Sequence, residues 1–215
     1  MGWAQAFEVQ QRLVASRKAG EITDQFLIVE HPHVVTVGRN GHEENLLASP
    51  EVLARTGIEL HRTDRGGDVT YHGPGQIVGY PILDLRDWKR DVGAYVRAIE
   101  QMLIDTLADF AIEAHREPGM TGVWTVSPAK IAAIGVHISR WVTSHGFALN
   151  HATDLQYFSY IVPCGLSKPV TSMEALGVIA PRETVVGRLR EHFERIFDLE
   201  SSGRLEPALQ LIGRV

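Results

Sequence analysis

The stretch GVWTVSPAKIAAIGVHISRWVTSHGFALN, residues 122–150, decides the fold class. It contains three runs rich in β-branched or aromatic residues, at 122–126, 130–138 and 141–150, and such runs predict strands. The three runs follow one another without a helix between them. Strands that come in clusters of this kind favour a mainly antiparallel sheet.

Outside this stretch the chain alternates between clusters of strands and isolated helices. Further strands are predicted at residues 25–30, 34–37, 58–62, 69–71 and 77–85. Pro81, inside the last of these, indicates an edge strand or a bulge. Helices are predicted for the segment that stops at Gly20 and for residues 50–57, 92–112, 154–161 and 181–197. We therefore expect an α+β fold with a central, mainly antiparallel sheet flanked by helices, in one domain of residues 1–215.

Composition excludes several classes of protein. The chain of 215 residues carries 21 Lys and Arg against 26 Asp and Glu, a formal charge of -5, whereas nucleic-acid binders are more often basic. A single cysteine forms no intramolecular disulfide and suits a reducing, cytoplasmic location. The N-terminus lacks the apolar core of a signal peptide, and no stretch approaches the roughly 18 apolar residues of a membrane span. We expect neither a nucleic-acid nor a membrane partner.

The segment RGGDVTYHGPGQ, residues 65–76, is rich in both glycine and polar side chains. It has four glycines, which allow positive φ angles and let a ligand come close to backbone N–H groups. One reading is a structural hairpin with a glycine-rich end. The polar side chains favour a ligand site instead, although the glycine spacing matches neither a P-loop nor a dinucleotide fingerprint.

Lys130 opens an otherwise apolar strand with small neighbours at Ala133 and Gly135. A lysine there either caps a strand end at the surface or places a partly desolvated ammonium beside a nucleophile. Small neighbours would leave room for a bound chain, and we expect Ala132 and Val78 to line the same tunnel.

Cys164 stands between proline and glycine in PCGL, unlike the usual buried cysteine inside an apolar run. A lone cysteine is more often inert than catalytic. Reactivity requires a thiolate, and therefore a cation or a helix N-terminus nearby. Lys130 is a candidate for that cation. The histidines are too scattered for a zinc site, so we expect no metal.

The three motifs together, RGGDVTYHGPGQ, KIAAIGVHISRWVTSHGFALN and PCGL, resemble in order and spacing the lipoyl(octanoyl) transferases. These are the octanoyl-[acyl-carrier-protein]:protein N-octanoyltransferases of lipoate synthesis. The similarity runs from the N-terminal helix through Phe197 and implies a fold shared with biotin and lipoate protein ligases. Family members usually have a short strand before the first helix, whereas this sequence begins at that helix.

The resemblance also implies site residues and partners. It implies a catalytic dyad of Cys164 and Lys130. It implies substrate contacts at Arg65, Gly66, Gly67, Asp68, Val69, Thr70, Tyr71, His72, Ala133, Ile134, Gly135, Gly146, Phe147 and Ala148. The position of Asp68 varies in the family, and we assign it no role of its own. No metal, ATP or other cofactor is implied. The implied donor is octanoyl-acyl carrier protein, and the acceptors are lipoyl domains of 2-oxoacid dehydrogenases and the glycine cleavage H protein.

We therefore expect octanoyl transfer through a thioester on Cys164, with Lys130 stabilising the thiolate and then accepting a proton from the incoming amine. His72 would orient groups or shuttle a proton. Three alternatives remain: an ATP-dependent lipoate or biotin ligase, a cysteine hydrolase in which water replaces the acceptor lysine, and a non-catalytic acyl-binding module.

Overall fold

The structure is a computed structural model that describes residues 1–162 and 168–199. Cys164, expected to be the nucleophile, lies outside the described residues, as do the other residues of the PCGL segment. None of the helices in the described ranges combines the length and the apolarity needed to cross a lipid bilayer.

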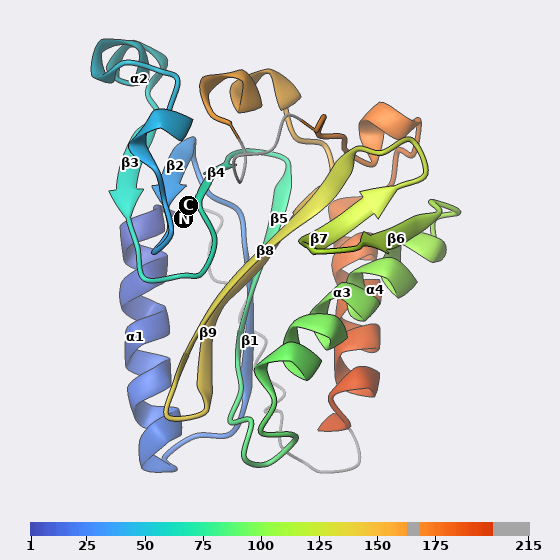
Figure 1. Ribbon diagram of the computed structural model, residues 1–215. Helices are drawn as coiled ribbons and strands as arrows, with labels where there is room; N and C mark the ends of the chain where they lie inside the picture. Colours follow the sequence, from blue (N-terminus) through green and yellow to red (C-terminus); the bar gives the residue numbers. More distant parts are fainter. Residues whose placement is uncertain (163–167, 200–215) are drawn as a thin grey trace.

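A six-stranded sheet forms the centre of the molecule (Figure 1). Its order is β1 (Gln25–Val29), β5 (Gln76–Ile82), β9 (Val142–Asn150), β8 (Lys130–Ser139), β7 (Met120–Thr125) and β6 (Ala114–Glu117). Every neighbouring pair is antiparallel. The strands predicted in residues 122–150 are thus confirmed, and they form one continuous antiparallel run.

The edge assignment for Pro81 is wrong, because β5 lies between β1 and β9. The ladder between β5 and β9 is interrupted after the pair Gly79↔Phe147 and pairing resumes at Asp84↔Val142, so Pro81 lies within the interruption. A proline without an N–H is therefore accommodated inside the sheet. Strand β6, which was not predicted, has the polar sequence AHRE and no apolar alternation.

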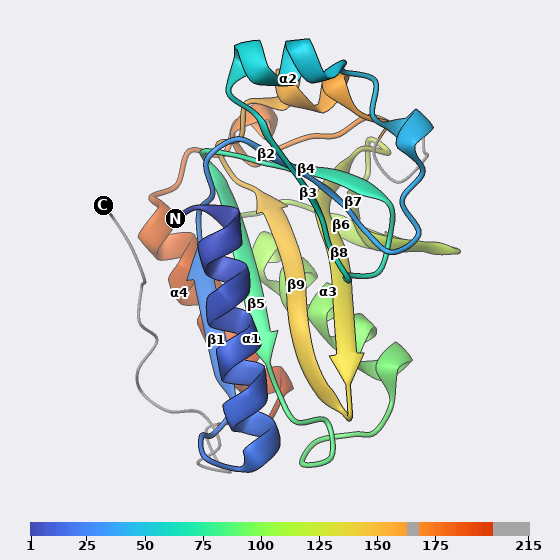
Figure 2. The ribbon, with the colours of Figure 1, turned by 90° about the vertical axis from the view of Figure 1, so that its left-hand side faces the viewer.

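Helices cover both faces of this sheet (Figure 2). Helix α1 (Trp3–Ala19) lies on one face and ends at Gly20, whose φ is 75°. Helices α3 (Val92–Ala108) and α4 (Arg182–Ile196) pack together on the opposite face. The prediction extended α3 to residue 112, but the helix ends at Ala108 and Ala111 has a positive φ. Ile112 is nevertheless buried, so its apolar character reflects core packing rather than helix continuation.

A second sheet of three strands lies beside one end of the large one (Figure 1). Its central strand is β2 (Val34–Val37), which pairs in parallel with β3 (Glu59–Arg62) and antiparallel with β4 (Val69–His72). The short helix α2 (Pro50–Thr56) connects β2 to β3. The remaining elements are the 3-10 helices η1 (Glu43–Asn45), η2 (Leu155–Tyr160) and η4 (Glu174–Leu176).

The buried apolar residues form three clusters, and their positions locate the candidate site. The largest lies between the large sheet and helices α3 and α4. A second lies beneath the small sheet. The third, under α1, contains Leu27, Val29, Val78, Tyr80 and Ala148. Part of this third cluster borders a hollow between α1 and the two sheets.

Candidate active site

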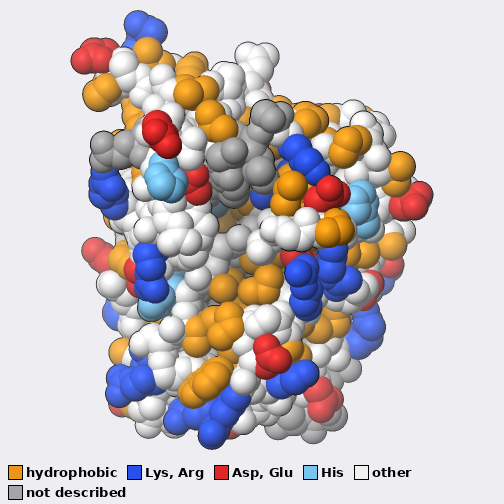
Figure 3. Space-filling model, in the orientation of Figure 1, with side chains coloured by type: hydrophobic (Ala, Val, Ile, Leu, Met, Phe, Trp, Pro, Cys, Tyr) orange, Lys and Arg blue, Asp and Glu red, His pale blue; other side chains and the backbone are white. Residues whose placement is uncertain are grey.

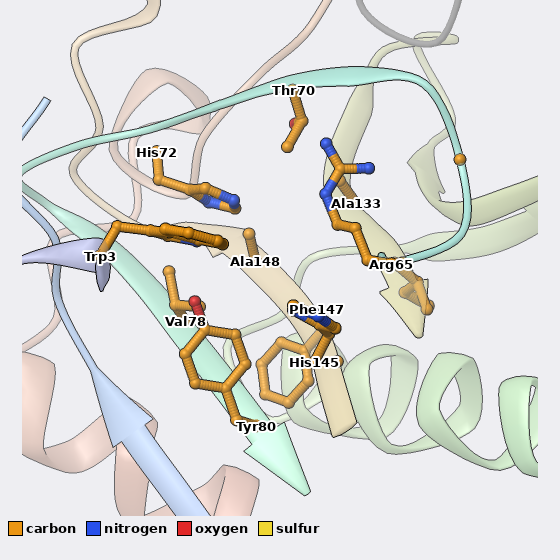
Figure 4. Close-up of a pocket in the computed structure, with 14 residues that line it drawn as sticks. Trp3, Arg65, Thr70, His72, Val78, Tyr80, Ala133, His145, Phe147 and Ala148 are labelled. Carbon is orange, nitrogen blue, oxygen red and sulfur yellow. The ribbon is translucent and has the colours of Figure 1, made fainter. Parts of the chain in front are cut away.

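The hollow lies where the start of α1, strand β4 and the strands β5, β8 and β9 meet (Figure 4). Its empty volume is ≈ 470 Å³, the open mouth included. It is lined by Trp3, Arg65, Gly67, Thr70, His72, Val78, Tyr80, Ala133, Ile134, Gly135, His145, Gly146, Phe147 and Ala148. Most residues expected to contact substrate are therefore brought together here.

Strands β8 and β9 form the floor of the hollow. Their register pairs Ala133 with Ala148 and Gly135 with Gly146, so small side chains face each other across the ladder. A Cβ on Gly135 would come within 2.8 Å of the carbonyl oxygen of Gly66. The glycine-rich connection can therefore rest directly on this floor. Ala132, expected to line the tunnel, packs into the main core instead.

Strand β4 divides its residues between the hollow and the second core. Thr70 and His72 line the hollow. Val69 and Tyr71 are fully buried beneath the small sheet. This division follows from the two-residue alternation of a strand, in which neighbouring side chains point to opposite faces.

Asp68 and Gly66 also lie outside the hollow. The Asp68 carboxylate accepts a hydrogen bond from the backbone N–H of His42 at 2.9 Å and another from the Asn45 side chain. Gly66 lines a neighbouring groove. Among the residues expected to contact substrate, Asp68 therefore has a structural role in the loop before α2.

His72 is held in one tautomer by a chain of side-chain amides. The Gln76 amide nitrogen donates to Asn150 Oδ1 at 2.9 Å, and the Asn150 amide nitrogen donates to the carbonyl of Thr171 at 2.9 Å. Gln76 Oε1 must therefore accept the bond of 2.8 Å from His72 Nδ1. Burial, with a smaller contribution from His31, lowers the pKa of His72 to about 3. The ring is neutral, and its Nε2 carries a lone pair.

A second chain of hydrogen bonds fixes His31 and Tyr80. His31 Nδ1 donates to the carbonyl of Met1 at 2.9 Å, so its Nε2 accepts from the Tyr80 hydroxyl at 2.7 Å. Burial lowers the pKa of His31 to about 4 and raises the pKa of Tyr80. Both groups are neutral at physiological pH.

Arg65 is a buried cation at the other side of the hollow, with 8% of its surface exposed. Its guanidinium donates to the carbonyl of Thr36 at 2.6 Å and to the carbonyl of Gly66 at 3.0 Å. His145 Nε2 lies 2.8 Å from an Asp64 carboxylate oxygen, and burial lowers the pKa of His145. These bonds hold the glycine-rich connection against β2 and β9.

Lys130 is buried, with 7% of its surface exposed, so it is not a surface cap on its strand. Its ammonium lies 5.0 Å from the centre of the Trp124 ring, and that of Lys168 lies at the same distance. A narrow cavity beside Lys130 is lined by Thr70 and Ala133, which also line the hollow. Lys130 therefore lies next to one end of the hollow.

The backbone on both sides of residues 163–167 is firmly held. The N–H of Val162 donates to the carbonyl of Asn45 at 2.7 Å. On the other side, the N–H of Lys130 donates to the carbonyl of Pro169 at 2.8 Å, and the N–H of Thr171 donates to the carbonyl of Lys130 at 2.9 Å. Residues 169–171 therefore run directly alongside Lys130.

An open groove also reaches Lys130 from the surface. It is lined by Gly66, Gly67, Val96, Gly119, Met120, Thr121, Lys130, Ile134, Gly135 and Val136. Figure 3 shows hydrophobic side chains along the middle of this face, with Lys and Arg side chains to both sides. Lys130 thus lines both the narrow cavity next to the hollow and a groove open to solvent.

Trp3, Tyr80 and His145 line the hollow although the sequence motifs did not assign them to it. Tyr80 was detectable, because Val78 and Tyr80 are two residues apart on one strand and therefore share a face. His145 lies within the motif at residues 130–150, which gave it no role of its own. Trp3 lies in the first turn of a helix, and nothing in the sequence predicts that its side chain contacts the sheet.

Comparisons with known proteins find similar sequences over most of the chain. The family model described as the lipoyl protein ligase A/B catalytic domain matches residues 3–194. An octanoyltransferase of Solibacter usitatus is 68% identical over 198 residues, which cover 92% of this chain and 90% of the relative. An octanoyltransferase of Koribacter versatilis is 53% identical over 213 residues, covering 94% of this chain and 85% of the relative.

Solved structures show the same fold at low sequence identity. A bi-partite lipoate protein ligase of Thermoplasma acidophilum gives a TM-score of 0.71 at 15% identity, covering 92% of this chain and 80% of that one. A lipoate-protein ligase A solved with ATP gives a TM-score of 0.71 at 16% identity, covering 88% and 81%. The expected ligase-like fold is confirmed.

Proposed function

The chain belongs to the family of lipoyl protein ligase A/B catalytic domains and, within it, to the octanoyltransferases, and we propose that it moves an octanoyl group from acyl carrier protein to a lysine of a lipoyl domain. This is the first step of endogenous lipoate synthesis. The observation that carries the proposal is the juxtaposition of a buried lysine, Lys130, with an apolar hollow that has a floor of alanine and glycine.

The transfer takes two steps through a thioester on Cys164. The Cys164 thiolate attacks the thioester carbonyl of the octanoyl carrier, the carbon–sulfur bond to the carrier breaks, and the carrier's thiol leaves after taking up a proton. The ε-amine of the acceptor lysine then attacks the octanoyl-Cys164 carbonyl. An amide forms, the amine loses a proton, and the cysteine sulfur is released. Two protein partners use one site in turn, so ping-pong kinetics follow.

Lys130 serves both steps in this scheme. Its ammonium stabilises the cysteine thiolate before the first attack, because a neighbouring cation favours the charged form of a thiol. That ammonium gives a proton to the departing carrier thiolate, and the resulting neutral amine accepts the proton that the attacking lysine loses. The backbone bonds between Lys130 and residues 169–171 support this role, since they hold the segment that follows the cysteine beside the lysine.

The acceptors in this proposal are lipoyl domains of 2-oxoacid dehydrogenases and the glycine cleavage H protein. The Thermoplasma ligase that shares this fold was solved in a study of that enzyme and its E2 lipoyl domain. We propose a cytoplasmic enzyme that needs neither metal nor ATP and acts without a nucleic-acid or membrane partner.

Residues 1–215 form one acyltransferase domain in this proposal. The hollow itself draws on Trp3 from α1, His72 from the small sheet and Ala148 from the large sheet. Neither sheet supplies the whole site, so a division between them would divide the site as well.

Intact-protein mass spectrometry tests the route. The wild-type protein, mixed with octanoyl-acyl carrier protein, should gain a hydroxylamine-labile octanoyl adduct that a lipoyl domain discharges, and Cys164→Ala should gain none. Turnover without any adduct would remove Cys164 as the nucleophile. Transfer that requires ATP and free octanoate would identify a ligase. Free octanoate as the main product in the presence of a lipoyl domain would identify a hydrolase. Function retained by Cys164→Ser would identify an acyl-binding module.

A further inference from the structure

The hollow has two chemically different ends. At one end Thr70 and Ala133 separate it from the cavity beside Lys130. At the other end the indole of Trp3 lies over Val78 and Ala148, with the His72 ring alongside (Figure 4). Val78 and Ala148 are direct partners in the ladder between β5 and β9. The indole therefore covers a cross-strand pair on the β5 side of the hollow, whereas Lys130 belongs to β8, two strands away across the sheet.

Trp3 is held in this position from two sides. It stacks on Phe7, one helical turn along α1, with ring centres 5.1 Å apart and an interplanar angle of 13°. It also stacks on His61 of β3 at 4.8 Å and 28°. Only 5% of its surface is exposed. A side chain packed against both its own helix and the small sheet is a fixed wall rather than a mobile one.

The polar groups near Trp3 carry no charge that a ligand would have to meet. His72 is neutral, with its Nδ1–H bonded to Gln76. The Tyr80 hydroxyl is bonded to His31. An uncharged end with an aromatic wall suits the methyl end of an alkyl chain, because burying apolar surface there costs no desolvation of an ion.

We propose that Trp3 sets the length of the acyl chain that the enzyme accepts, by closing the end of the hollow against which the terminal methyl group packs. This inference rests on the proposed octanoyl transfer, with the thioester near Lys130 and the chain running past Thr70 and Ala133 toward Val78. Removing the indole opens space under Phe7, and a longer acyl chain gains contacts there. Each further buried methylene strengthens binding about fourfold, so two of them change selectivity about fifteenfold.

The test compares octanoyl-, decanoyl- and dodecanoyl-acyl carrier protein as donors to a lipoyl domain. For Trp3→Ala we expect the ratio of kcat/KM for decanoyl over octanoyl to rise about fifteenfold relative to wild type. Trp3→Phe keeps an aromatic wall and should raise the ratio less. Phe7→Ala is the matched control, since Phe7 shares the stack without lining the hollow, and it should leave the ratio within about twofold.

The outcomes separate this inference from the function on which it rests. An unchanged ratio in folded Trp3→Ala, or an equal rise in Phe7→Ala, would overturn the role of Trp3 while octanoyl transfer by the wild type stands. If Trp3→Ala does not fold, Trp3→Leu replaces it, and an unchanged ratio in that variant overturns the role as well. A wild type that transfers no octanoyl group refutes the proposed function instead.

Discussion

The glycine-rich segment at residues 65–72 and the paired strands β8 and β9 were both expected to contact substrate, yet they contribute in different ways. In the first segment Thr70 and His72 line the hollow, while Val69 and Tyr71 pack in the core beneath the small sheet. In the second, successive residues of each strand line the hollow, at 133–135 in β8 and at 145–148 in β9.

The difference arises from the size of the side chains. A strand with large side chains on both faces, such as β4, presents only every second residue to a site. Glycine and alanine leave the backbone accessible, so neighbouring positions of β8 and β9 can border the same space. A motif quoted as one unit can therefore combine substrate contacts with packing residues, and substitutions at adjacent positions should have different effects.

The largest effect should come from Lys130, at the start of the paired strands. Lys130→Ala should lower kcat for octanoyl transfer about 10²–10⁴-fold, because a proton-transfer group contributes that much. Lys168→Ala is the matched control, since its ammonium lies at the same distance from Trp124 but is partly exposed and paired with Glu117. It should change kcat by less than about threefold. Equal losses in both variants, measured by transfer kinetics, would contradict a catalytic role for Lys130.

The alternation in β4 predicts opposite results at neighbouring residues. Tyr71→Ala should reduce the free energy of unfolding by about 3–5 kcal/mol, as for other buried aromatic side chains, because Tyr71 is fully buried and bonded to His33. Thr70→Ala should cost about 1 kcal/mol and act mainly on KM for the octanoyl carrier. Urea denaturation and transfer kinetics measure the two quantities. A larger stability loss at Thr70 than at Tyr71 would be inconsistent with this division.

Close packing of the paired strands predicts that a side chain at position 146 destabilises the protein. A Cβ there would come within 2.2 Å of the carbonyl oxygen of Gly79, a backbone atom that cannot move alone. Gly146→Ala should destabilise the protein by about 3 kcal/mol. In Gly187→Ala the new Cβ meets nothing within 4 Å, and the change should stabilise α4 by about 0.5–1 kcal/mol. Thermal denaturation distinguishes the two, and a harmless Gly146→Ala would show that the strands can separate.

The buried ring on the site face of β4 predicts a pH dependence of stability. The pKa of His72 is about 3 in the folded protein and about 6.5 in the unfolded chain, so below pH 6.5 the unfolded chain binds a proton that the folded ring does not. The free energy of unfolding should therefore fall by about 2 kcal/mol between about pH 6.5 and 4.5 from this group alone. His31, which also has a lowered pKa, adds a similar slope.

In His72→Gln the free energy of unfolding should depend less steeply on pH, because the contribution of this ring is lost. His42→Gln, at an exposed position, should leave the pH dependence as in wild type. Urea denaturation at several pH values measures both. The same slope in wild type and His72→Gln would mean that the ring titrates normally in the folded state.

The elements carrying strong local patterns could be predicted from sequence. The β-branched runs predicted β2, β8 and β9, and the helix predicted at residues 50–57 is α2, which Ser49 caps. The features that were predicted wrongly or not at all depend on partners that are distant in the sequence. Strand β6 is polar and short, and it forms because β7 turns back on it. Pro81 is tolerated because the ladder with β9 is interrupted between Gly79 and Asp84.

The candidate site shows the same limit. The motifs that carry the family resemblance implied contacts at Arg65, His72 and the small residues of β8 and β9, and these residues line one hollow. They did not identify Trp3, since its contacts with Phe7 and His61 appear only when α1 meets the small sheet. The motifs also did not indicate that Asp68 and Tyr71 lie outside the hollow, because only the pairing of β4 with β2 fixes which residues face the core.

The position of β5 between β1 and β9 has a consequence during synthesis. Its pairing with β1 involves residues already made, but its other partner, residues 147–150, leaves the ribosome much later. At a synthesis rate of about 5–20 residues per second, the backbone edge at Ile77 and Val78 remains unpaired for on the order of seconds until β9 is made. A nascent chain in that interval exposes an apolar edge to other chains and lacks the Ala148 wall of its hollow. Binding competence therefore arrives late in translation, together with β9.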